Sequence, residues 1–166
     1  MQGACVDFYS YNGLRNGSNR MVFSPEGTEL YVGQTMREWA GAMEGLQRIK
    51  FNGGSIFEIL SMHLTRDGFE LEFTQPVDAG IGEKPEAFAT ESYWYEYSSN
   101  YGGPESQSEK VRVSSVTWSA DRRKVRLVYP KLQAQKVMRL NLTGFTSGAQ
   151  PLGHAMVAYT INRLAK

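Results

Sequence analysis

The sequence has few residues that could build a disulfide-linked or metal-stabilised structure. Its 166 residues include one cysteine, Cys5, and two histidines. One cysteine excludes an internal disulfide, and this set cannot supply a zinc site of the Cys₂His₂ type. No C-x-x-C-H haem attachment motif occurs either, so the sequence predicts no cofactor and no bound metal. Cys5 is then a free or buried thiol, or the partner of a cysteine in a segment upstream, as in an exported protein.

The sequence also lacks a strong charge of either sign and a long apolar run. It has 18 basic and 17 acidic side chains, for a formal net charge of +1. This balance argues against nucleic acid or an anionic membrane as the main partner. No apolar stretch approaches the roughly 20 residues of a membrane-spanning helix. The first residues lack the charged and apolar regions of a signal peptide. With 41% hydrophobic residues the chain resembles an ordinary globular protein with a real core.

What the sequence does contain is one strand–turn–strand pattern that occurs three times, over residues 21–32, 62–73 and 116–128. In each copy apolar and polar residues alternate on both sides of a turn that begins with Ser or Thr and has an acidic residue two positions later. Alternation with period two is typical of half-buried strands. The Ser or Thr can cap the turn, and we expect Gly27 and Gly68 to adopt positive φ. The pattern predicts an all-β protein.

Further strands are predicted at regular spacing, over residues 46–51, 88–97, 137–142 and 157–161. We expect irregular structure over residues 1–20 and a long loop over 33–45. Asn52-Gly-Gly-Ser55 is the clearest break in the pattern, because three turn formers precede a capping residue. We therefore predict a small β segment over residues 1–52 and an Ig-like β-sandwich over residues 56–166.

The two histidines and most acidic residues fit no catalytic motif. His63 lies between Met62 and Leu64 in a predicted strand, so it should face solvent. His154 lies in a connection before the last strand, where a general base could stand, but no Ser or Cys nucleophile has a recognisable setting. Glu70 and Glu72 fall on the polar face of a strand, and a glycosidase pair would have to assemble across strands.

One loop gathers three carboxylates, Asp78, Glu83 and Glu86. Carboxylate oxygens are the ligands that Ca²⁺ prefers, but the spacing matches no calcium-binding loop. A solvated acidic loop and a calcium site both stay open, and the former is favoured.

The segment Tyr93-Trp-Tyr-Glu-Tyr97 is unusually rich in aromatic residues. In a strand its three tyrosines would line one face and Trp94 the other. Exposed tyrosines could stack on sugar rings, and an aromatic face could equally pack on an opposing sheet or a neighbouring domain. The candidate contact residues are Tyr93, Tyr95, Tyr97, Tyr101 and Trp39.

Several segments together have a familiar order. They are Gln2-Gly-Ala-Cys5, Asn19-Arg-Met-Val-Phe-Ser-Pro-Glu-Gly27, Leu30-Tyr-Val-Gly-Gln-Thr35, Gly45-Leu-Gln-Arg-Ile49, Asp67-Gly-Phe-Glu-Leu-Glu-Phe-Thr-Gln-Pro-Val-Asp78, Tyr101-Gly-Gly-Pro-Glu105, Pro151-Leu-Gly-His-Ala155 and Ala158-Tyr-Thr-Ile-Asn162. In this order they resemble the C-terminal region of exported bacterial glucose/sorbosone dehydrogenase propellers of the pyrroloquinoline-quinone type. Such propellers are frequently fused to a c-type haem domain. The second half also resembles a bacterial Ig-like domain.

The resemblance implies a periplasmic or extracellular protein whose first part is a fragment of a propeller blade. It implies an upstream propeller or haem c domain as partner. The quinone and calcium sites of the family would come from blades outside this sequence, so no catalytic residue carries over.

Three functions follow as hypotheses. The first is a non-catalytic accessory module of an exported sugar-oxidising or carbohydrate-active protein, with a docking or glycan-contact role. The second is a purely structural Ig-like spacer. The third is a free-standing hydrolase, with His154 and a loop carboxylate converging across strands.

Overall fold

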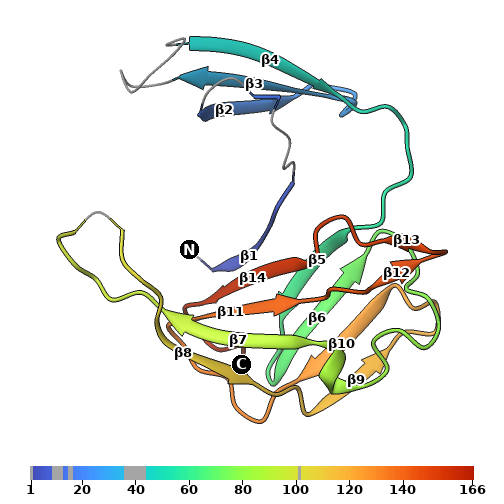
Figure 1. Ribbon diagram of the computed structural model, residues 1–166, viewed down its shortest axis with the longest axis vertical. Helices are drawn as coiled ribbons and strands as arrows, with labels where there is room; N and C mark the ends of the chain where they lie inside the picture. Colours follow the sequence, from blue (N-terminus) through green and yellow to red (C-terminus); the bar gives the residue numbers. More distant parts are fainter. Residues whose placement is uncertain (1, 9–12, 15–16, 36–43, 101) are drawn as a thin grey trace. The chain divides into compact units, whose positions relative to one another are not determined.

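The computed structural model describes residues 2–8, 13–14, 17–35, 44–100 and 102–166. The chain divides into two units, and each is described by itself. One unit is Tyr9–Ser55; the other combines Met1–Phe8 with Ile56–Lys166. Both consist of antiparallel β-strands (Figure 1). The all-β fold class is confirmed.

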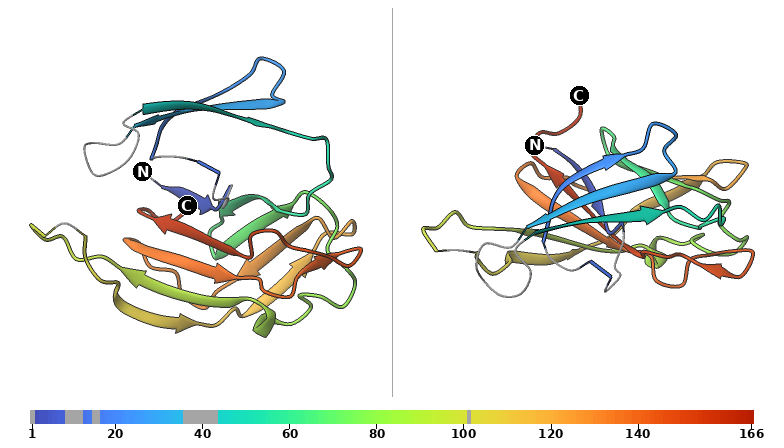
Figure 2. Two further views of the ribbon diagram at one scale, coloured as in Figure 1. Left: turned by 45° about the horizontal axis from the view of Figure 1, so that its top comes forward. Right: turned by 90° about the horizontal axis from the view of Figure 1, so that it is seen from above.

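The larger unit is a sandwich of two sheets that lie face to face (Figures 1 and 2). Five strands form one sheet, in the order β1 (Gly3–Val6), β14 (Met156–Ile161), β11 (Lys136–Asn141), β7 (Ala89–Trp94) and β8 (Ser106–Val111). Four strands form the other, in the order β5 (Ile59–Leu64), β6 (Gly68–Phe73), β10 (Lys124–Val128) and β9 (Ser115–Trp118). A short ribbon pairs β12 (Thr146–Ser147) with β13 (Gln150–Pro151), and the 3₁₀ turn η1 (Pro85–Ala87) precedes β7.

The core of the sandwich follows directly from the alternation in the sequence. Phe69, Leu71 and Phe73 leave the same face of β6 and are fully buried, while Glu70 and Glu72 between them are partly exposed. Leu140 and Val157 supply the facing sheet. Burying such side chains stabilises the fold by about 1.5 to 3 kcal/mol each before entropy is counted. The same alternation leaves His63 exposed, as predicted.

The prediction of irregular structure over residues 1–20 is wrong at both ends of that range. Residues 3–6 form β1, which pairs with β14 in the register Gly3↔Thr160 to Val6↔Val157. The Gln2 side chain accepts hydrogen bonds from the backbone N–H groups of Asn162 and Arg163. Met1–Phe8 therefore belong to the sandwich, although the predicted boundary kept them with the segment to residue 52.

The smaller unit contains one three-stranded sheet, in the order β2 (Ser18–Phe23), β3 (Glu29–Thr35) and β4 (Glu44–Lys50). β3 lies in the middle, and its Leu30 and Val32 are buried. Every residue of β2 is exposed. The expected hairpin over residues 21–32 and the strand near residues 46–51 are both present.

The three predicted hairpins form, but their turns differ. Gly27 adopts φ 70°, as expected. Gly68 does not lie in the left-handed region, so that prediction is wrong; a Cβ there would stand 1.7 Å from the Leu127 carbonyl oxygen. Glycine is therefore required at position 68 by the close approach of β10.

Across the part of the chain that the structure describes, no helix has the length and apolar character needed to cross a bilayer.

Candidate functional site

The predicted row of tyrosines is interrupted, because β7 ends at Trp94. Tyr93 is buried, with 7% of its surface exposed, while Tyr95 is 47% exposed and Tyr97 is fully exposed. The prediction that all three line one face of a strand is therefore wrong. Tyr95 and Tyr97 belong to the connection between β7 and β8, residues 95–105, which projects beyond both strands (Figure 1). We call this connection the aromatic arm.

Arg139 of β11 links the end of the aromatic arm to β7. Its guanidinium donates to both carboxylate oxygens of Glu105, at 2.8 and 3.1 Å, and to Glu91 at 2.7 Å. Glu105 is the last residue of the arm and Glu91 lies in β7, so one cation joins β11, β7 and the end of the arm that precedes β8. These hydrogen bonds, first to Glu105 and then to Glu91, raise the pKa of Arg139. Two-oxygen contacts of this kind are strong and directional.

The same guanidinium covers Tyr93. Its carbon lies 4.8 Å from the centre of the Tyr93 ring, a cation–π distance. Burial raises the pKa of the Tyr93 hydroxyl. The Tyr95 ring stands edge-on against Tyr93, with centroids 5.5 Å apart. Tyr93 is thus a support for the arm, and Tyr95 and Tyr97 are its exposed aromatic surface.

The two other predicted contact residues, Tyr101 and Trp39, lie outside the residues that the structure describes. Sequence reasoning missed Arg139 and Glu105, which hold the arm. Arg139 had a signal: it is the one charged residue within the predicted strand over 137–142. Nothing local linked it to a tyrosine 46 positions earlier.

A hollow of about 430 Å³ lies beside Arg139, between the start of β7, the end of β8 and β11, at the other end of the β7–β8 hairpin from the arm. Its lining combines Arg139 and Asn141 with the apolar Ala89 and Met156, and Met156 is half exposed. Polar groups over an apolar floor suit a ligand that has both hydroxyl groups and apolar faces.

His154 lies beside a carboxylate that the sequence did not single out, Glu58. The ring Nδ1 is 3.0 Å from Glu58 Oε1, and the His154 backbone N–H donates to Glu58 Oε2 at 3.0 Å. A Cβ on Gly153 would collide with Glu58 Oε1, so a larger residue there would displace the Glu58 side chain. Among the described residues no hydroxyl or thiol bonds to the other ring nitrogen. The pair therefore fastens the connection before β14 to the chain before β5.

The acidic loop is fixed by protein groups. The Asp78 carboxylate accepts hydrogen bonds from Thr146 Oγ1 at 2.7 Å and from the N–H groups of Gly148 and Ala149 at 2.7 and 3.3 Å. These hydrogen bonds lower the pKa of Asp78, and the bond from Thr146 has the largest effect. In the described parts of the chain no three His, Cys, Asp or Glu side chains cluster closely enough to hold a metal ion.

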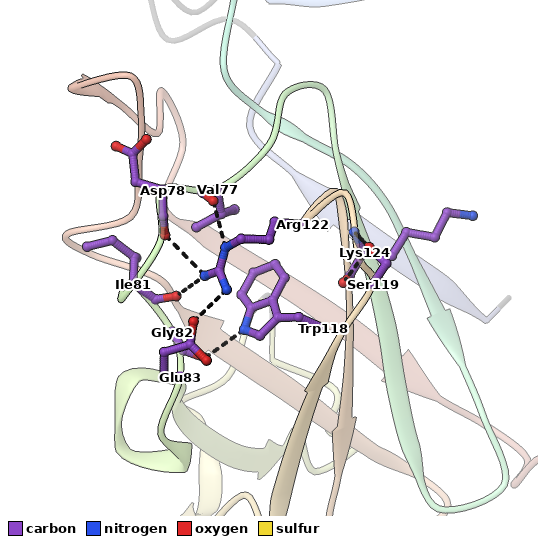
Figure 3. Close-up of polar contacts among 9 residues, drawn as sticks. All are labelled: Val77, Asp78, Ile81, Gly82, Glu83, Trp118, Ser119, Arg122 and Lys124. Atoms are coloured by element: carbon purple, nitrogen blue, oxygen red, sulfur yellow. Dashed lines mark hydrogen bonds and ion pairs between the residues drawn. The ribbon is translucent and has the colours of Figure 1, made fainter.

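Arg122 from the β9–β10 turn anchors the same loop (Figure 3). It donates to three backbone carbonyls, of Val77 at 2.9 Å, Asp78 at 3.1 Å and Ile81 at 2.7 Å, and it pairs with the Glu83 carboxylate. Its guanidinium carbon lies 4.6 Å from the Trp118 ring. This is a structural anchor, because its donors are spent on the loop that it holds.

Comparisons with known proteins add no relative. A scan of protein families found no matching model, and searches of curated proteins and of solved structures found no significant similarity. The function is therefore inferred from the chain itself.

Proposed function

We propose that this chain is a non-catalytic module that contacts carbohydrate through the aromatic arm. One observation carries the proposal: Tyr97 is fully exposed and Tyr95 half exposed on a connection whose last residue, Glu105, is held by Arg139. The flat faces of the two tyrosine rings suit the apolar faces of sugar rings, and the hydroxyl at each tip can donate to a sugar oxygen.

The hollow beside Arg139 supports the same proposal. Arg139 borders both features, so a chain of sugars on the arm could continue over Ala89 and Met156. The carboxylates that bind Arg139 hold its planar group in place. A fixed polar group loses less entropy on binding than a free one.

The resemblance noted in the sequence supports a wider proposal. The module would belong to an exported sugar-oxidising or carbohydrate-active protein and act in the periplasm or outside the cell. Its partner would be a propeller or a haem c domain.

A glycan array and affinity gels with the purified chain test the carbohydrate contact. We expect binding that the double variant Tyr95→Ala/Tyr97→Ala weakens about tenfold or more, since each ring contributes about 1 kcal/mol. Phe8→Ala is the matched control, because Phe8 is an exposed aromatic residue of the same unit, 69% exposed and outside the arm. Both variants should keep the wild-type circular dichroism spectrum. Binding that survives the double variant would exclude the arm, and no binding to any glycan would favour the spacer.

A second function, docking, has an observation of its own in the smaller unit. Met21, Val22 and Phe23 of β2 are 57 to 64% exposed, although they are consecutive and point to both faces of the sheet. Among the described strands β2 is an edge, and these three positions have no charge or proline to prevent pairing. This edge suits a strand added by a partner domain. Val22→Lys should then abolish association of the chain with that partner domain in sedimentation experiments. Unchanged association would exclude β2 as the docking edge.

A further inference from the structure

The connection between β4 and β5 contains an Asn-Gly pair that the proposed carbohydrate contact does not use (Figure 1). Residues 51–58 form neither strand nor helix, and Asn52 and Gly53 are both exposed. The pair lies just before Ser55, where the smaller unit ends. A chemical change at this pair therefore acts on the segment of chain that leads from the smaller unit to the larger one.

The side-chain amide of Asn52 is turned toward the residues that follow it. Its Oδ1 accepts a hydrogen bond from the Gly54 backbone N–H at 3.0 Å, a local contact that asparagine favours in turns. A donor at a carbonyl oxygen stabilises the negative charge that develops there when a nucleophile attacks the carbonyl carbon. The hydrogen bond from Gly54 therefore makes the amide carbon Cγ of Asn52 easier to attack.

The nucleophile next to that carbon is the backbone nitrogen of Gly53. Within the part of the chain that the structure describes, the Gly53 N–H forms no hydrogen bond. Gly53 has φ 78°, and a Cβ built there would meet no atom within 4 Å, so the space around the pair is open. Glycine also has no Cβ of its own to shield the nitrogen or to restrict its approach.

We propose that the Asn52–Gly53 pair is a site of spontaneous deamidation. In the first step the Gly53 nitrogen attacks Asn52 Cγ. The bond between this nitrogen and Cγ forms, the Cγ–Nδ2 bond breaks, and Nδ2 leaves as ammonia with the proton of the Gly53 nitrogen. The product is a cyclic succinimide that contains the peptide nitrogen.

Water then opens the succinimide at either of its two carbonyl carbons. Attack at Cγ gives an aspartate at position 52. Attack at the backbone carbonyl carbon gives isoaspartate, in which the main chain runs through the side-chain carbonyl and is one methylene longer. Water is the only other reactant, so the conversion requires no enzyme, metal or oxidant.

The conversion changes both the charge and the covalent length of the connection. The chain has 18 basic and 17 acidic side chains, so one more acid brings its formal net charge from +1 to zero. Proteins near zero net charge associate more readily. The added methylene of isoaspartate follows directly after Phe51, whose N–H donates to the Thr28 carbonyl at 2.8 Å.

Asn141 provides an internal comparison within the same chain. Its Oδ1 also accepts the N–H two residues later, that of Thr143, at 2.9 Å. The next residue differs, because Leu142 is fully buried and its N–H donates to the Ala155 carbonyl at 2.8 Å. The Leu142 nitrogen is neither accessible nor free, so Asn141 should stay intact where Asn52 converts.

Peptide mapping by mass spectrometry, after incubation of the full chain in mildly alkaline buffer, tests the proposal. Trypsin releases residues 51–66, in which Asn52 is the only side-chain amide. We expect this peptide to gain about 1 Da and to convert at least about tenfold faster than Asn141. It should also separate into aspartate and isoaspartate forms. Isoaspartate is the signature of the ring, because direct hydrolysis of the side-chain amide yields aspartate alone.

A glycine variant tests the role of the following residue. Gly53→Ala adds a Cβ beside the attacking nitrogen and should slow the conversion about tenfold or more. Gly80→Ala is the matched control, because Gly80 is also exposed, has φ 84° and has open space around it, but it follows an alanine. The control should convert at position 52 at the wild-type rate.

Three outcomes would overturn the inference: an unchanged mass of the 51–66 peptide, conversion to aspartate alone, or an equal rate in Gly53→Ala. Conversion of Asn141 as fast as Asn52 would also overturn it, since the structure would then have no influence on the reaction. Glycan binding enters none of these measurements, so their failure leaves the proposed function untouched.

Discussion

The turn between β2 and β3 and the turn between β9 and β10 have the same backbone hydrogen bonds. They differ in the residue type that occupies the left-handed position. In both, a serine N–H donates to the carbonyl five residues later, and the residue three positions on donates back to the serine carbonyl. Ser24 and Ser119 also accept, through Oγ, the N–H five residues later. The left-handed position is Gly27 in the first turn, at φ 70°, and Arg122 in the second, at φ 54°.

This difference shows how a tertiary contact can replace a local preference. Glycine adopts positive φ without steric cost, whereas other residues in sparsely populated backbone regions cost about 1 to 3 kcal/mol. At position 122 this cost is offset, because the guanidinium donates hydrogen bonds to three carbonyls of the 77–83 loop and forms an ion pair with one of its carboxylates. In the smaller unit a Cβ at position 27 would meet no atom within 4 Å, and glycine suffices.

The third hairpin, between β5 and β6, gives the largest expected effect on the free energy of unfolding. Its turn is tighter, with the Thr65 N–H bonded to the Gly68 carbonyl. Gly68→Ala would place a Cβ 1.7 Å from the Leu127 carbonyl oxygen and force β6 from β10 in the core. We expect a loss of about 4 kcal/mol in the free energy of unfolding, measured by urea denaturation. Gly3→Ala is the control, because a Cβ there meets no atom within 4 Å; equal stability of both variants would contradict the steric argument.

Replacing Arg122 separates its contacts from its backbone strain. Arg122→Ala loses the hydrogen bonds and keeps the left-handed residue, so we expect a loss of about 3 kcal/mol. Arg122→Gly loses the same bonds but relieves the backbone, and should be about 1 kcal/mol more stable than the alanine variant. Urea denaturation followed by Trp118 fluorescence measures both. If the glycine variant were no more stable than the alanine variant, strain at this position would be excluded.

Gly27→Ala tests the turn whose left-handed residue makes no contact. A Cβ at position 27 meets no atom within 4 Å, so the only cost is positive φ, about 1 kcal/mol. Faster hydrogen exchange of the Gly27 and Glu29 amides would report the loss. The turn amides of Gly27→Asn should exchange more slowly than those of Gly27→Ala, since asparagine tolerates positive φ better. The reverse order would refute the assignment of the cost to positive φ.

The smallest effect concerns pH and the acidic residue of the β9–β10 turn. Ser119 Oγ donates to the Asp121 carboxylate at 2.6 Å, and this bond, followed by that from the Arg123 N–H, lowers the pKa of Asp121 from 3.8. A carboxyl whose pKa is lower in the folded state adds stability above the unfolded pKa and loses it as pH falls through the folded value. The stability gap between wild type and Asp121→Asn should therefore be constant near neutral pH and shrink below about pH 4. Urea midpoints across this range measure it; a gap that widens in acid would contradict the assignment.

Much of the fold was predictable because it depends on local alternation. Phe69, Leu71 and Phe73 alternate with glutamates, and this pattern alone identified β6 and its buried face. β8 shows the limit, since its sequence Ser-Gln-Ser-Glu-Lys-Val has no apolar alternation. It forms because β7 offers backbone partners, and polar side chains suit an edge strand.

The candidate site was only partly predictable for a similar reason. Tyr95 and Tyr97 are exposed, as a glycan contact requires, but Tyr93 is covered by Arg139 and serves the arm as support.

The sequence by itself determined the all-β character, the three hairpins, most strands of the sandwich and the buried face of β6, because side-chain alternation and turn preferences act over a few residues. Tertiary structure decided which tyrosines reach solvent, that β1 pairs with β14 and that Arg122 holds the 77–83 loop. These outcomes depend on strand register and on hydrogen bonds and ion pairs between residues 34 to 160 positions apart. Local patterns in the sequence do not specify such contacts.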